Sequence, residues 1–198
     1  VFVGRISTNI AAEVSAIANR IVDYEQTTEP WKEKNLLSAA YLNYQGEPLL
    51  EYLQTDGALF MEFMRNTCLA EQENFTMYEQ EGVVPSFPSN LPVNYDNLRN
   101  KLNSESWGFI NWSAHGSSTY SSRKVWMVDF NNNNLPDGGE MNWEGMVDCQ
   151  SFNNLQNQNG TVIYAASCYN GMLDDNNSCL AEYALIKKAV GVIAATRT

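Results

Sequence analysis

The sequence predicts an α/β fold in which a mostly parallel sheet is covered by helices on both faces. Continuous apolar runs of strand length alternate along the chain with segments of helical spacing. Parallel strands need crossover connections, and these are usually helical. The length of 198 residues, of which 44% are hydrophobic, is enough for one domain with a substantial core.

The first half of the chain contains two predicted strand–helix units. Residues 1–6 are typical of the end of a buried strand, and apolar residues then recur at helical steps at Ile10, Val14, Ile17 and Ile21. A second apolar run over residues 36–44 precedes helical spacing over residues 58–69. Three prolines between residues 82 and 92 predict an irregular connection rather than a domain boundary.

The second half continues the alternation. A short helix is expected over residues 95–102 and an apolar strand over residues 107–114. Residues 124–130 alternate as a strand does, and the Asn- and Gly-rich stretch 131–139 is typical of a loop or hairpin tip. The remaining predicted elements are a strand, a helix and a strand over residues 161–167, 178–188 and 190–195.

The charge balance narrows the range of partners. The chain has 12 Lys and Arg residues against 23 Asp and Glu residues, a formal net charge of -11. An acidic field repels phosphate backbones and anionic lipid headgroups, so neither nucleic acid nor a membrane is an expected partner, whereas a basic peptide would be attracted. No apolar run approaches the length needed to cross a bilayer.

Two residues capable of catalysis lie at the ends of predicted core strands. His115, the only histidine, follows residues 107–114, and Gly116 then lets the backbone turn and present its N–H group. Cys168 follows residues 161–167 in the same way. Sites in parallel sheets form beyond the carboxyl ends of strands, so neighbouring strands would place an imidazole opposite a thiol. That pairing raises the thiolate fraction and indicates a cysteine hydrolase.

Taken separately, each residue also has an unreactive interpretation. A lone histidine at a strand end is more often hydrogen-bonded and inert, and free cysteines are among the most buried residues. Four cysteines without CxxC spacing are too few for a disulfide scaffold and do not fit a structural zinc site. Position distinguishes Cys168 from the cysteines on a predicted helix, in an irregular stretch and near a helix start, which are Cys68, Cys149 and Cys179.

The segments around these positions resemble a known family. They are NWSAHGSS (111–118), VIYAASCYNG (162–171) and CLAEYALIKKAVGVIAAT (179–196), with VGRIS (3–7) and IVDYE (21–25) near the start. In their order of strand, His-Gly, strand, Cys, helix and strand, they are similar to the gingipain-type peptidases, which have a caspase-like fold. The interval from His115 to Cys168 is longer than is usual in that family.

The resemblance implies a caspase-like, Rossmann-like three-layer sandwich. Residues 1–198 would be a single catalytic domain, which we expect to be part of a longer protein. His115 would act as the general acid and base, Cys168 would form a thioester, and the N–H groups of Gly116 and Cys168 would hold the oxyanion. Ala166 and Ser167 are expected to contact the substrate. The expected function is that of a cysteine endopeptidase.

The resemblance also locates a specificity pocket. Gingipains carry an acidic group on the segment that matches residues 53–62, and that group selects basic residues before the cut. Asp56 stands at the matching position, so cleavage of protein or peptide substrates after Arg or Lys is expected. Capping of the helix that begins there is an equal alternative. Glu47 or Glu51 could orient the imidazole, or lie in solvated surface.

Further properties are implied by the family alone. The chemistry requires no cofactor, but family members bind structural calcium, and a run of oxygen-bearing side chains that suits it, or is only a polar loop, comprises Asp174, Asp175, Asn176 and Asn177. A propeptide or companion domains and a secreted or cell-surface location are expected. In the family an aromatic pocket wall follows the strand matching residues 190–195, whereas this sequence ends at Thr198.

Two other functions stay open at this point. A caspase-like scaffold that has lost activity would serve as a binding or assembly module, which the missing pocket wall favours and the presence of His115 and Cys168 opposes. The other is an unrelated thiol-dependent transferase. Neither a GxGxxG motif nor a phosphate loop supports a nucleotide-binding version.

Overall fold

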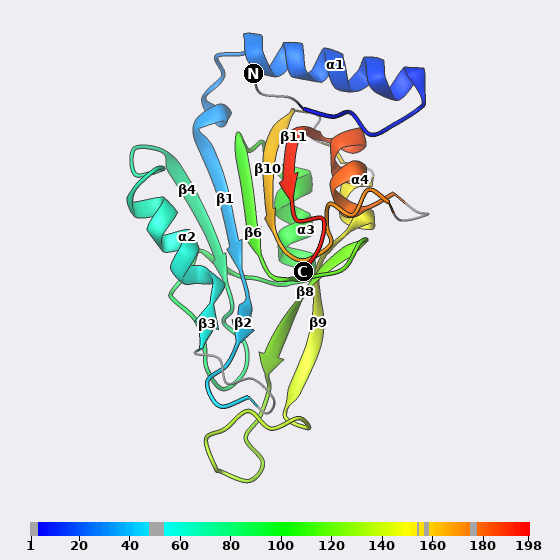
Figure 1. Ribbon diagram of the computed structural model, residues 1–198. Coiled ribbons are helices and arrows are strands. Elements are labelled where there is room, and N and C mark those ends of the chain that lie inside the picture. The colour runs from blue at the N-terminus through cyan, green and yellow to red at the C-terminus, as the bar shows by residue number, and fades with distance from the viewer. Residues whose placement is uncertain (1–3, 48–53, 154, 157–158, 175–177) are drawn as a thin grey trace.

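The computed structural model describes residues 4–47, 54–153, 155–156, 159–174 and 178–198. Its centre is a six-stranded sheet in the order β11-β10-β6-β1-β4-β5, with every neighbouring pair parallel (Figure 1). The strands are β1 (Lys34–Ala39), β4 (Glu73–Tyr78), β5 (Leu91–Pro92), β6 (Phe109–Ser113), β10 (Thr161–Ala166) and β11 (Ala189–Ala194). The predicted parallel sheet is confirmed, and the carboxyl ends of its strands share one edge.

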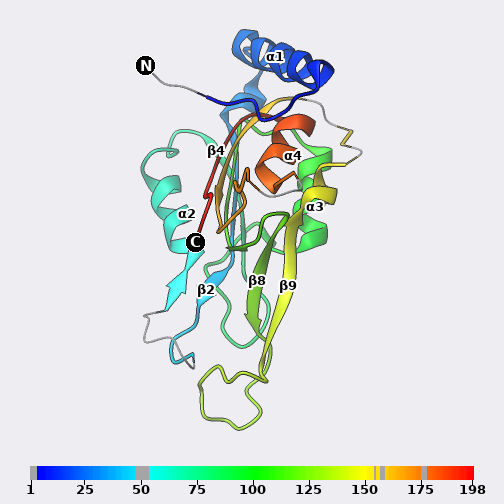
Figure 2. The ribbon, with the colours of Figure 1, turned by 45° about the vertical axis from the view of Figure 1, so that its right-hand side comes forward.

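Helices cover both faces of this sheet, with α2 on one face and α3 and α4 on the other (Figure 2). Their bounds are α2 (Gly57–Asn66), α3 (Tyr95–Ser104) and α4 (Leu180–Lys187). Met61 of α2 packs in one apolar cluster with Leu37 of β1. Leu98 of α3 and Leu180 of α4 belong to the larger cluster on the opposite face. The predicted three-layer sandwich is therefore confirmed.

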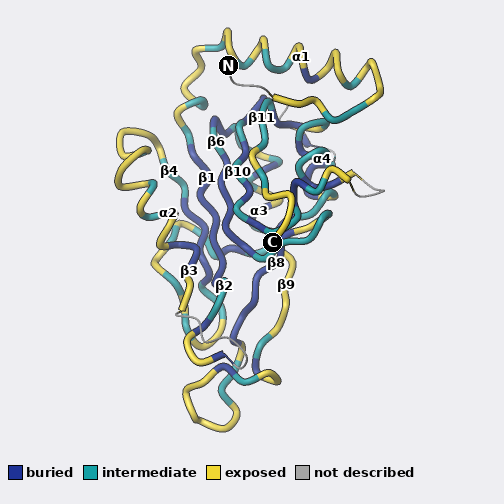
Figure 3. Tube along the Cα trace, viewed as in Figure 1, coloured by how far each residue is buried: buried dark blue, intermediate teal, exposed yellow. Residues whose placement is uncertain are grey.

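The middle strands of the sheet are the most buried part of the chain (Figure 3). Trp107, just before β6, and Trp112, within β6, are each only 1% exposed. Burying one large apolar side chain contributes about 1.5–3 kcal/mol, so this core fixes the strand ends firmly. None of the helices in the described part of the chain has both the length and the apolar character needed to cross a membrane.

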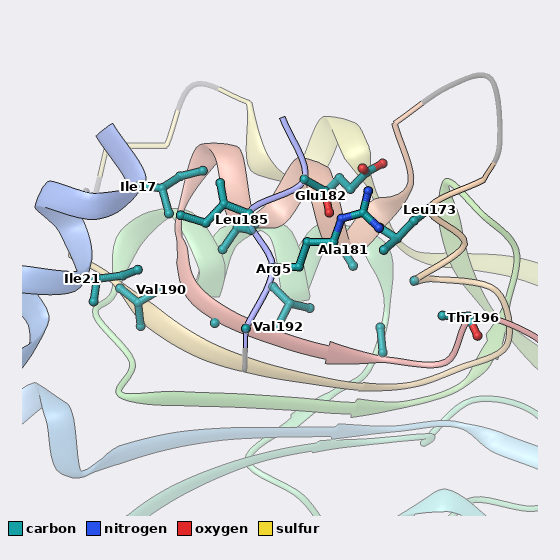
Figure 4. A pocket seen from close by; sticks show the side chains of 16 residues that line it. Arg5, Ile17, Ile21, Leu173, Ala181, Glu182, Leu185, Val190, Val192 and Thr196 are labelled. Carbon is teal, nitrogen blue, oxygen red and sulfur yellow. The ribbon is translucent and has the colours of Figure 1, made fainter. Parts of the chain in front are cut away.

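The N-terminal region differs from the prediction. Residues 4–6 belong to no strand, so the first predicted strand is wrong for the residues that the structure describes. Instead they line a cavity of about 530 Å³ together with α1 (Ala11–Gln26), α4 and β11 (Figure 4). The predicted helix is confirmed: Ile17 is fully buried against this cavity, and Arg20 donates to the carbonyl oxygen of Ala189 at 2.9 Å. Residues 4–6 therefore pack against the side chains around the cavity and form no backbone pairing with a neighbouring strand.

The run predicted as one strand over residues 36–44 is divided. β1 ends at Ala39, and β2 (Tyr41–Asn43) leaves the main sheet to pair antiparallel with β3 (Thr55–Asp56). The helix predicted over residues 58–69 is α2, which ends earlier, at Asn66. β4 was not predicted, because its alternating polar side chains gave no continuous apolar run.

A small antiparallel sheet projects beyond the carboxyl edge of the main sheet (Figure 1). Its strands are β7 (His115–Gly116), β8 (Tyr120–Trp126) and β9 (Met141–Asp148), and two short 3₁₀ helices lie elsewhere, at Pro30–Glu33 and Cys149–Phe152. Only the start of the strand predicted over residues 124–130 lies in β8, and β9 was not predicted. The loop predicted over residues 131–139 is confirmed as the connection between them.

Candidate active site

His115 and Cys168 follow adjacent parallel strands. β6 pairs with β10 so that Ser113 lies opposite Ala166, and the N–H of Ala114 donates to the carbonyl oxygen of Ala166 at 3.3 Å. Two positions beyond this pair, β6 leads to His115 and β10 leads to Cys168. The hydrogen-bond ladder, and not the long intervening chain, therefore brings the two residues to the same point of the sheet edge.

Gly116 packs directly on the backbone of Cys168. A Cβ atom at position 116 would lie 2.2 Å from the carbonyl oxygen of Cys168 and 2.8 Å from its backbone nitrogen. Real Cβ atoms do not approach so closely, so this contact requires glycine. The two backbones whose N–H groups the sequence assigns to an oxyanion hole thus touch each other.

A backbone carbonyl holds the imidazole of His115. Its Nε2 lies 2.8 Å from the carbonyl oxygen of Leu42 in β2. A carbonyl only accepts, so Nε2 carries the proton, and Nδ1 is the basic nitrogen of the neutral ring. Burial lowers the pKa of His115, and this outweighs the opposite effects of the Leu42 carbonyl and of Glu47. The neutral, proton-accepting form is therefore favoured at neutral pH.

An exposed tryptophan contacts the same imidazole. Trp143 of β9 meets His115 edge to face with ring centroids 4.7 Å apart, although 60% of Trp143 is exposed. The ammonium group of Lys124 lies 5.4 Å from the Trp143 ring centroid. The sequence pattern did not single out Trp143. The feature that could have indicated it is a large aromatic side chain among polar neighbours, in a strand, β9, that the sequence did not predict.

Glu47 does not bond to the imidazole as suggested from the sequence. Its Oε1 accepts from the N–H of Tyr44 at 2.6 Å, and its Oε2 forms a buried ion pair with Lys124. The ring N–H of His115 has the Leu42 carbonyl as its partner instead. The suggested direct role is corrected accordingly. Glu51 lies outside the described residues.

The chain turns sharply after Cys168. Tyr169 has a φ angle of 59°, in the left-handed region that residues other than glycine rarely enter. The N–H of Met172 closes the turn by donating to the carbonyl oxygen of Tyr169 at 3.0 Å. Such a conformation costs about 1–3 kcal/mol and persists only where surrounding contacts impose it, typically at functional sites.

Asn170 joins the loop after Cys168 to the loop after His115. Its Nδ2 donates to the carbonyl oxygens of Ser117 at 2.7 Å and Tyr120 at 3.2 Å. Its Oδ1 accepts from the hydroxyl of Ser121 at 2.7 Å and from the indole of Trp112. The side chain is fully buried, and both donors and both acceptor sites are used. Nothing in the sequence indicates this role, because an asparagine before glycine is typical of an ordinary turn.

Ala166 and Ser167 immediately precede Cys168. The hydroxyl of Ser167 lies 3.2 Å from the hydroxyl of Ser121, whose own proton goes to Asn170, so Ser167 is the donor and its buried side chain belongs to the Asn170 network. The carbonyl oxygen of Ala166 is used in the ladder with β6. Any contact of Ser167 with a substrate would therefore come from its backbone.

Asp56 lies in a cavity of about 480 Å³ lined by Tyr41, Gln54, Asp56, Leu59, Pro85, Ser86 and Phe87. The carboxylate caps α2 by accepting from the N–H of Ala58 at 2.9 Å, and it also accepts from the hydroxyl of Ser86 at 2.6 Å. An ionised carboxylate has about four acceptor sites, so capping leaves capacity for a ligand. The next residue, Gly57, packs against the end of β6, since its Cβ would lie 2.7 Å from the Ser113 hydroxyl. The cavity is thus anchored beside the strand that leads to His115.

The other cysteines have different surroundings. All four thiols are free. Burial raises the pKa of Cys149 to about 11 and also raises the pKa of Cys179, which makes both poor nucleophiles at neutral pH. Cys68 is exposed beyond the end of α2. Cys149 contacts the loop after His115 through the carbonyl oxygen of Thr119, whereas Cys168 is the cysteine whose backbone touches Gly116, the residue next to His115.

The acidic run suggested for calcium is described only at its start. The exposed carboxylate of Asp174 pairs with Arg197 at 2.7 Å. Residues 175–177 lie outside the described part of the chain. Within that part, no three His, Cys, Asp or Glu side chains are grouped closely enough to hold a metal ion by themselves.

A parallel α/β sheet with His-Gly after one strand and Cys after its neighbour is the arrangement of cysteine peptidases of the caspase-like fold. The chain belongs to peptidase family C25, whose model matches residues 1–198. No curated protein sequence matches the chain.

Solved structures of proteases are similar to the chain over nearly its whole length. The Arg-specific cysteine proteinase gingipain R (RgpB) has a TM-score of 0.65 and 19% identity, covering 99% of this chain and 40% of that chain. The complex of Porphyromonas gingivalis RgpB pro- and mature domains has a TM-score of 0.66 and 19% identity, covering 100% and 41%. A further protease structure has a TM-score of 0.60 and 16% identity, covering 94% and 35%. The fold is shared, and the chain spans about 40% of the length of the gingipain chains.

Proposed function

We propose that the chain is the catalytic part of a cysteine endopeptidase that forms a thioester at Cys168. The observation that carries the proposal is the parallel pairing of β6 with β10, which brings His115 and Cys168 to one point of the sheet edge. Membership of peptidase family C25 supports the same reaction class.

In the proposed reaction, Nδ1 of His115 takes the thiol proton of Cys168, and the thiolate sulfur attacks the scissile carbonyl carbon. The N–H groups of Gly116 and Cys168 hold the oxyanion. As the intermediate collapses, the C–N bond breaks, the imidazolium gives its proton to the leaving amine, and a thioester remains. Water, deprotonated by the same imidazole, then hydrolyses the thioester and restores the thiol.

We assign the Asp56 cavity to the Arg or Lys side chain before the cut. The carboxylate is 7% exposed, and charge pairing is stronger in such partly dry surroundings than in water. The rings of Tyr41 and Phe87 line the cavity and would cover the aliphatic stem of the basic side chain. The formal net charge of -11 favours basic substrates over acidic ones.

The wider setting follows from the same proposal. The substrates are proteins or peptides with basic residues, the location is secreted or cell-surface, and a propeptide or companion domains accompany the catalytic part. The support is that one similar structure is a complex of RgpB pro- and mature domains. The thiol–imidazole chemistry itself needs no cofactor.

The test is covalent labelling with peptidyl acyloxymethyl ketones that end in Arg, Asp or Ala, followed by mass mapping of the modified residue. We expect the Arg probe to modify Cys168 faster than the other two, and His115→Ala to abolish the modification. Cys68→Ser, which removes an exposed thiol, is the matched control and should leave labelling unchanged. Modification of another thiol while Cys168 stays free would overturn the dyad and favour an inactive binding scaffold.

A further inference from the structure

The tryptophan beside the proposed base exposes more surface than its contacts use. Trp143 meets His115 edge to face with ring centroids 4.7 Å apart, yet 60% of it is exposed. Aromatic side chains bury 150–250 Å² in a core, so roughly 100 Å² or more of Trp143 stays in contact with water. A single exposed apolar residue is ordinary on a protein surface, but this one lies against the group that must reach the substrate.

The ladder between β8 and β9 holds the indole in place. Lys124 and Trp143 are directly paired in the register, so their side chains share one face of the small sheet. The Lys124 ammonium lies 5.4 Å from the centroid of the Trp143 ring and is itself held by a buried ion pair with Glu47. The indole is therefore pre-organised, and a ligand that packs on it loses little binding energy in ordering it.

Trp143 lies on a different side of the imidazole from the Asp56 cavity. Figures 1 and 2 show β8 between β2 and β9. On the β2 side, Tyr41 pairs with Asp56 and lines the cavity, and the next residue, Leu42, holds the imidazole of His115 through its carbonyl. None of the described residues that line the cavity comes from β9. Trp143 is therefore separate from the site assigned to the residue before the cut.

The proposed reaction places the residue after the cut next to the imidazole. The imidazolium gives its proton to the leaving amine, so Nδ1 of His115 and that nitrogen must approach to about 3 Å. The nitrogen belongs to the residue after the cut, and only Cα separates it from the Cβ of that residue. The side chain therefore begins within about 6 Å of Nδ1. A ring centred 4.7 Å from the centre of the imidazole is within reach of it.

The chemistry of this surface selects the kind of side chain. An indole pairs edge to face or in an offset stack with another aromatic ring, and it gains from any large apolar group that removes it from water. Glycine offers neither interaction. The nearby Lys124 charge is balanced by Glu47, and the formal net charge of -11 disfavours an acidic side chain.

We propose that Trp143 determines specificity for the residue after the cut and favours a large apolar side chain there, above all an aromatic one. This inference rests on the proposed peptidase reaction at Cys168 and adds a second selected position to it. The preferred substrates are then proteins or peptides in which Arg or Lys is followed directly by an aromatic residue or leucine.

The test is acyl transfer from an N-acyl-arginine ethyl ester, whose leaving alcohol carries no amino-acid side chain. Once the thioester has formed at Cys168, either water or an added amino-acid amide can displace the thiol. With the amide, the amine nitrogen attacks the thioester carbonyl, the C–S bond breaks, and the amine proton passes through the imidazole to the sulfur. The amine thus occupies the place of the leaving group. We expect phenylalanine amide to capture the acyl group about tenfold more efficiently than glycine amide, measured by mass spectrometry of the products.

Two substitutions of Trp143 assign the preference to the indole. Trp143→Ala should reduce the capture ratio to about twofold or less, whereas Trp143→Phe should retain most of it. Both amides attack the same acyl-enzyme with the same base, so a changed pKa of His115 or a general loss of rate cancels in the ratio. Phe63→Ala, which removes an exposed ring on α2, is the matched control and should keep the parent ratio.

The outcomes separate this inference from the proposed function. Equal capture of the two amides by the parent, or an unchanged ratio in Trp143→Ala, would overturn the role of Trp143 and leave the peptidase reaction standing. If the parent forms no thioester from the arginine ester, the reaction itself is wrong, and the inference falls with it. Because Trp143 is exposed, its removal leaves no cavity in the core, and the melting temperature of each variant verifies that the fold is kept.

Discussion

Trp143 lies edge to face against His115, although β9 and β7 do not pair with each other. The indole therefore covers one side of an imidazole that would otherwise be more exposed to water. Because burial is the main cause that lowers the pKa of His115, part of that effect should depend on Trp143.

The first prediction concerns pH. The acid limb of kcat/KM reports the pKa of the free enzyme's base, so its midpoint is expected below the ordinary histidine value of about 6.5. Activity should be lost as the pH falls through the lowered pKa, because the ring must be neutral to accept the thiol proton. In Trp143→Ala the limb should move up toward about 6.5, and in Trp143→Phe it should move less. Phe63→Ala, which removes an exposed ring on α2, is the control. An unchanged limb in Trp143→Ala would show that the indole does not shield the base.

The second prediction uses the contact of Gly116 with Cys168. Gly116→Ala places a methyl group 2.2 Å from the Cys168 carbonyl oxygen, so one of the two backbones must move. Loss of one oxyanion donor costs about 10²–10³ in kcat, and a comparable loss is expected here. Gly145→Ala on β9 is the matched control, because its nearest neighbour atom would be 3.8 Å away. Full activity in Gly116→Ala, measured on an Arg-ended peptide amide, would rule out this contact as part of the site.

The third prediction separates the two interpretations of Asp56. Asn caps helices about as well as Asp, so Asp56→Asn should leave α2 stable while removing the charge. If the carboxylate binds Arg or Lys, kcat/KM for a basic substrate should fall about 30-fold or more, in line with a lost charge-assisted pair of about 2 kcal/mol or more. The comparison is Asn94→Ala, which removes the cap of α3 and should lower stability by about 1 kcal/mol without changing specificity. Unchanged selectivity in Asp56→Asn would leave capping as its whole role.

The fourth prediction concerns the scaffold under the site. Asn170→Ala deprives the buried Ser121 hydroxyl and Trp112 indole of an acceptor, and it removes the donor to the part-buried carbonyls of Ser117 and Tyr120. Each unsatisfied buried group costs about 1–3 kcal/mol, so unfolding in urea should show a loss of about 3 kcal/mol or more. Asn66→Ala, at an exposed position of α2, should stay within about 0.5 kcal/mol of the parent. A small effect in Asn170→Ala would mean that water replaces the lost bonds and that the two loops are not rigidly joined.

The parts of the fold that could be predicted are those where local pattern and tertiary environment agree. β6 is buried along nearly its whole length and β10 is buried at every second residue and half-buried at the others, so both have mostly apolar sequences that end where the strands end. The N-terminal run over residues 1–6 has the same appearance, but residues 4–6 pack over a cavity by α1 instead of joining the sheet. An apolar sequence predicts that the segment is buried, but it does not predict which element of the fold covers it.

The positions of the candidate site residues could be predicted to the same extent. The positions of His115 and Cys168 could be read from strand ends, because strand direction alone determines which edge they share. Leu42, Trp143 and Asn170 could not, since each acts through a contact with a residue distant in sequence. A backbone carbonyl in particular has no side-chain signature at all.

The pairing of Ser113 with Ala166 has a consequence for how this chain can change. Because the ladder between β6 and β10 fixes the two strand ends, the segment between them is a closed loop whose length barely affects the closure entropy: each doubling costs only about 0.6 kcal/mol. Insertions between the two strands therefore change the free energy of folding little. This interval can accommodate an additional element such as the β8–β9 sheet without altering the relative position of His115 and Cys168. The same pairing joins residues far apart in sequence, and non-local contacts of this kind slow folding.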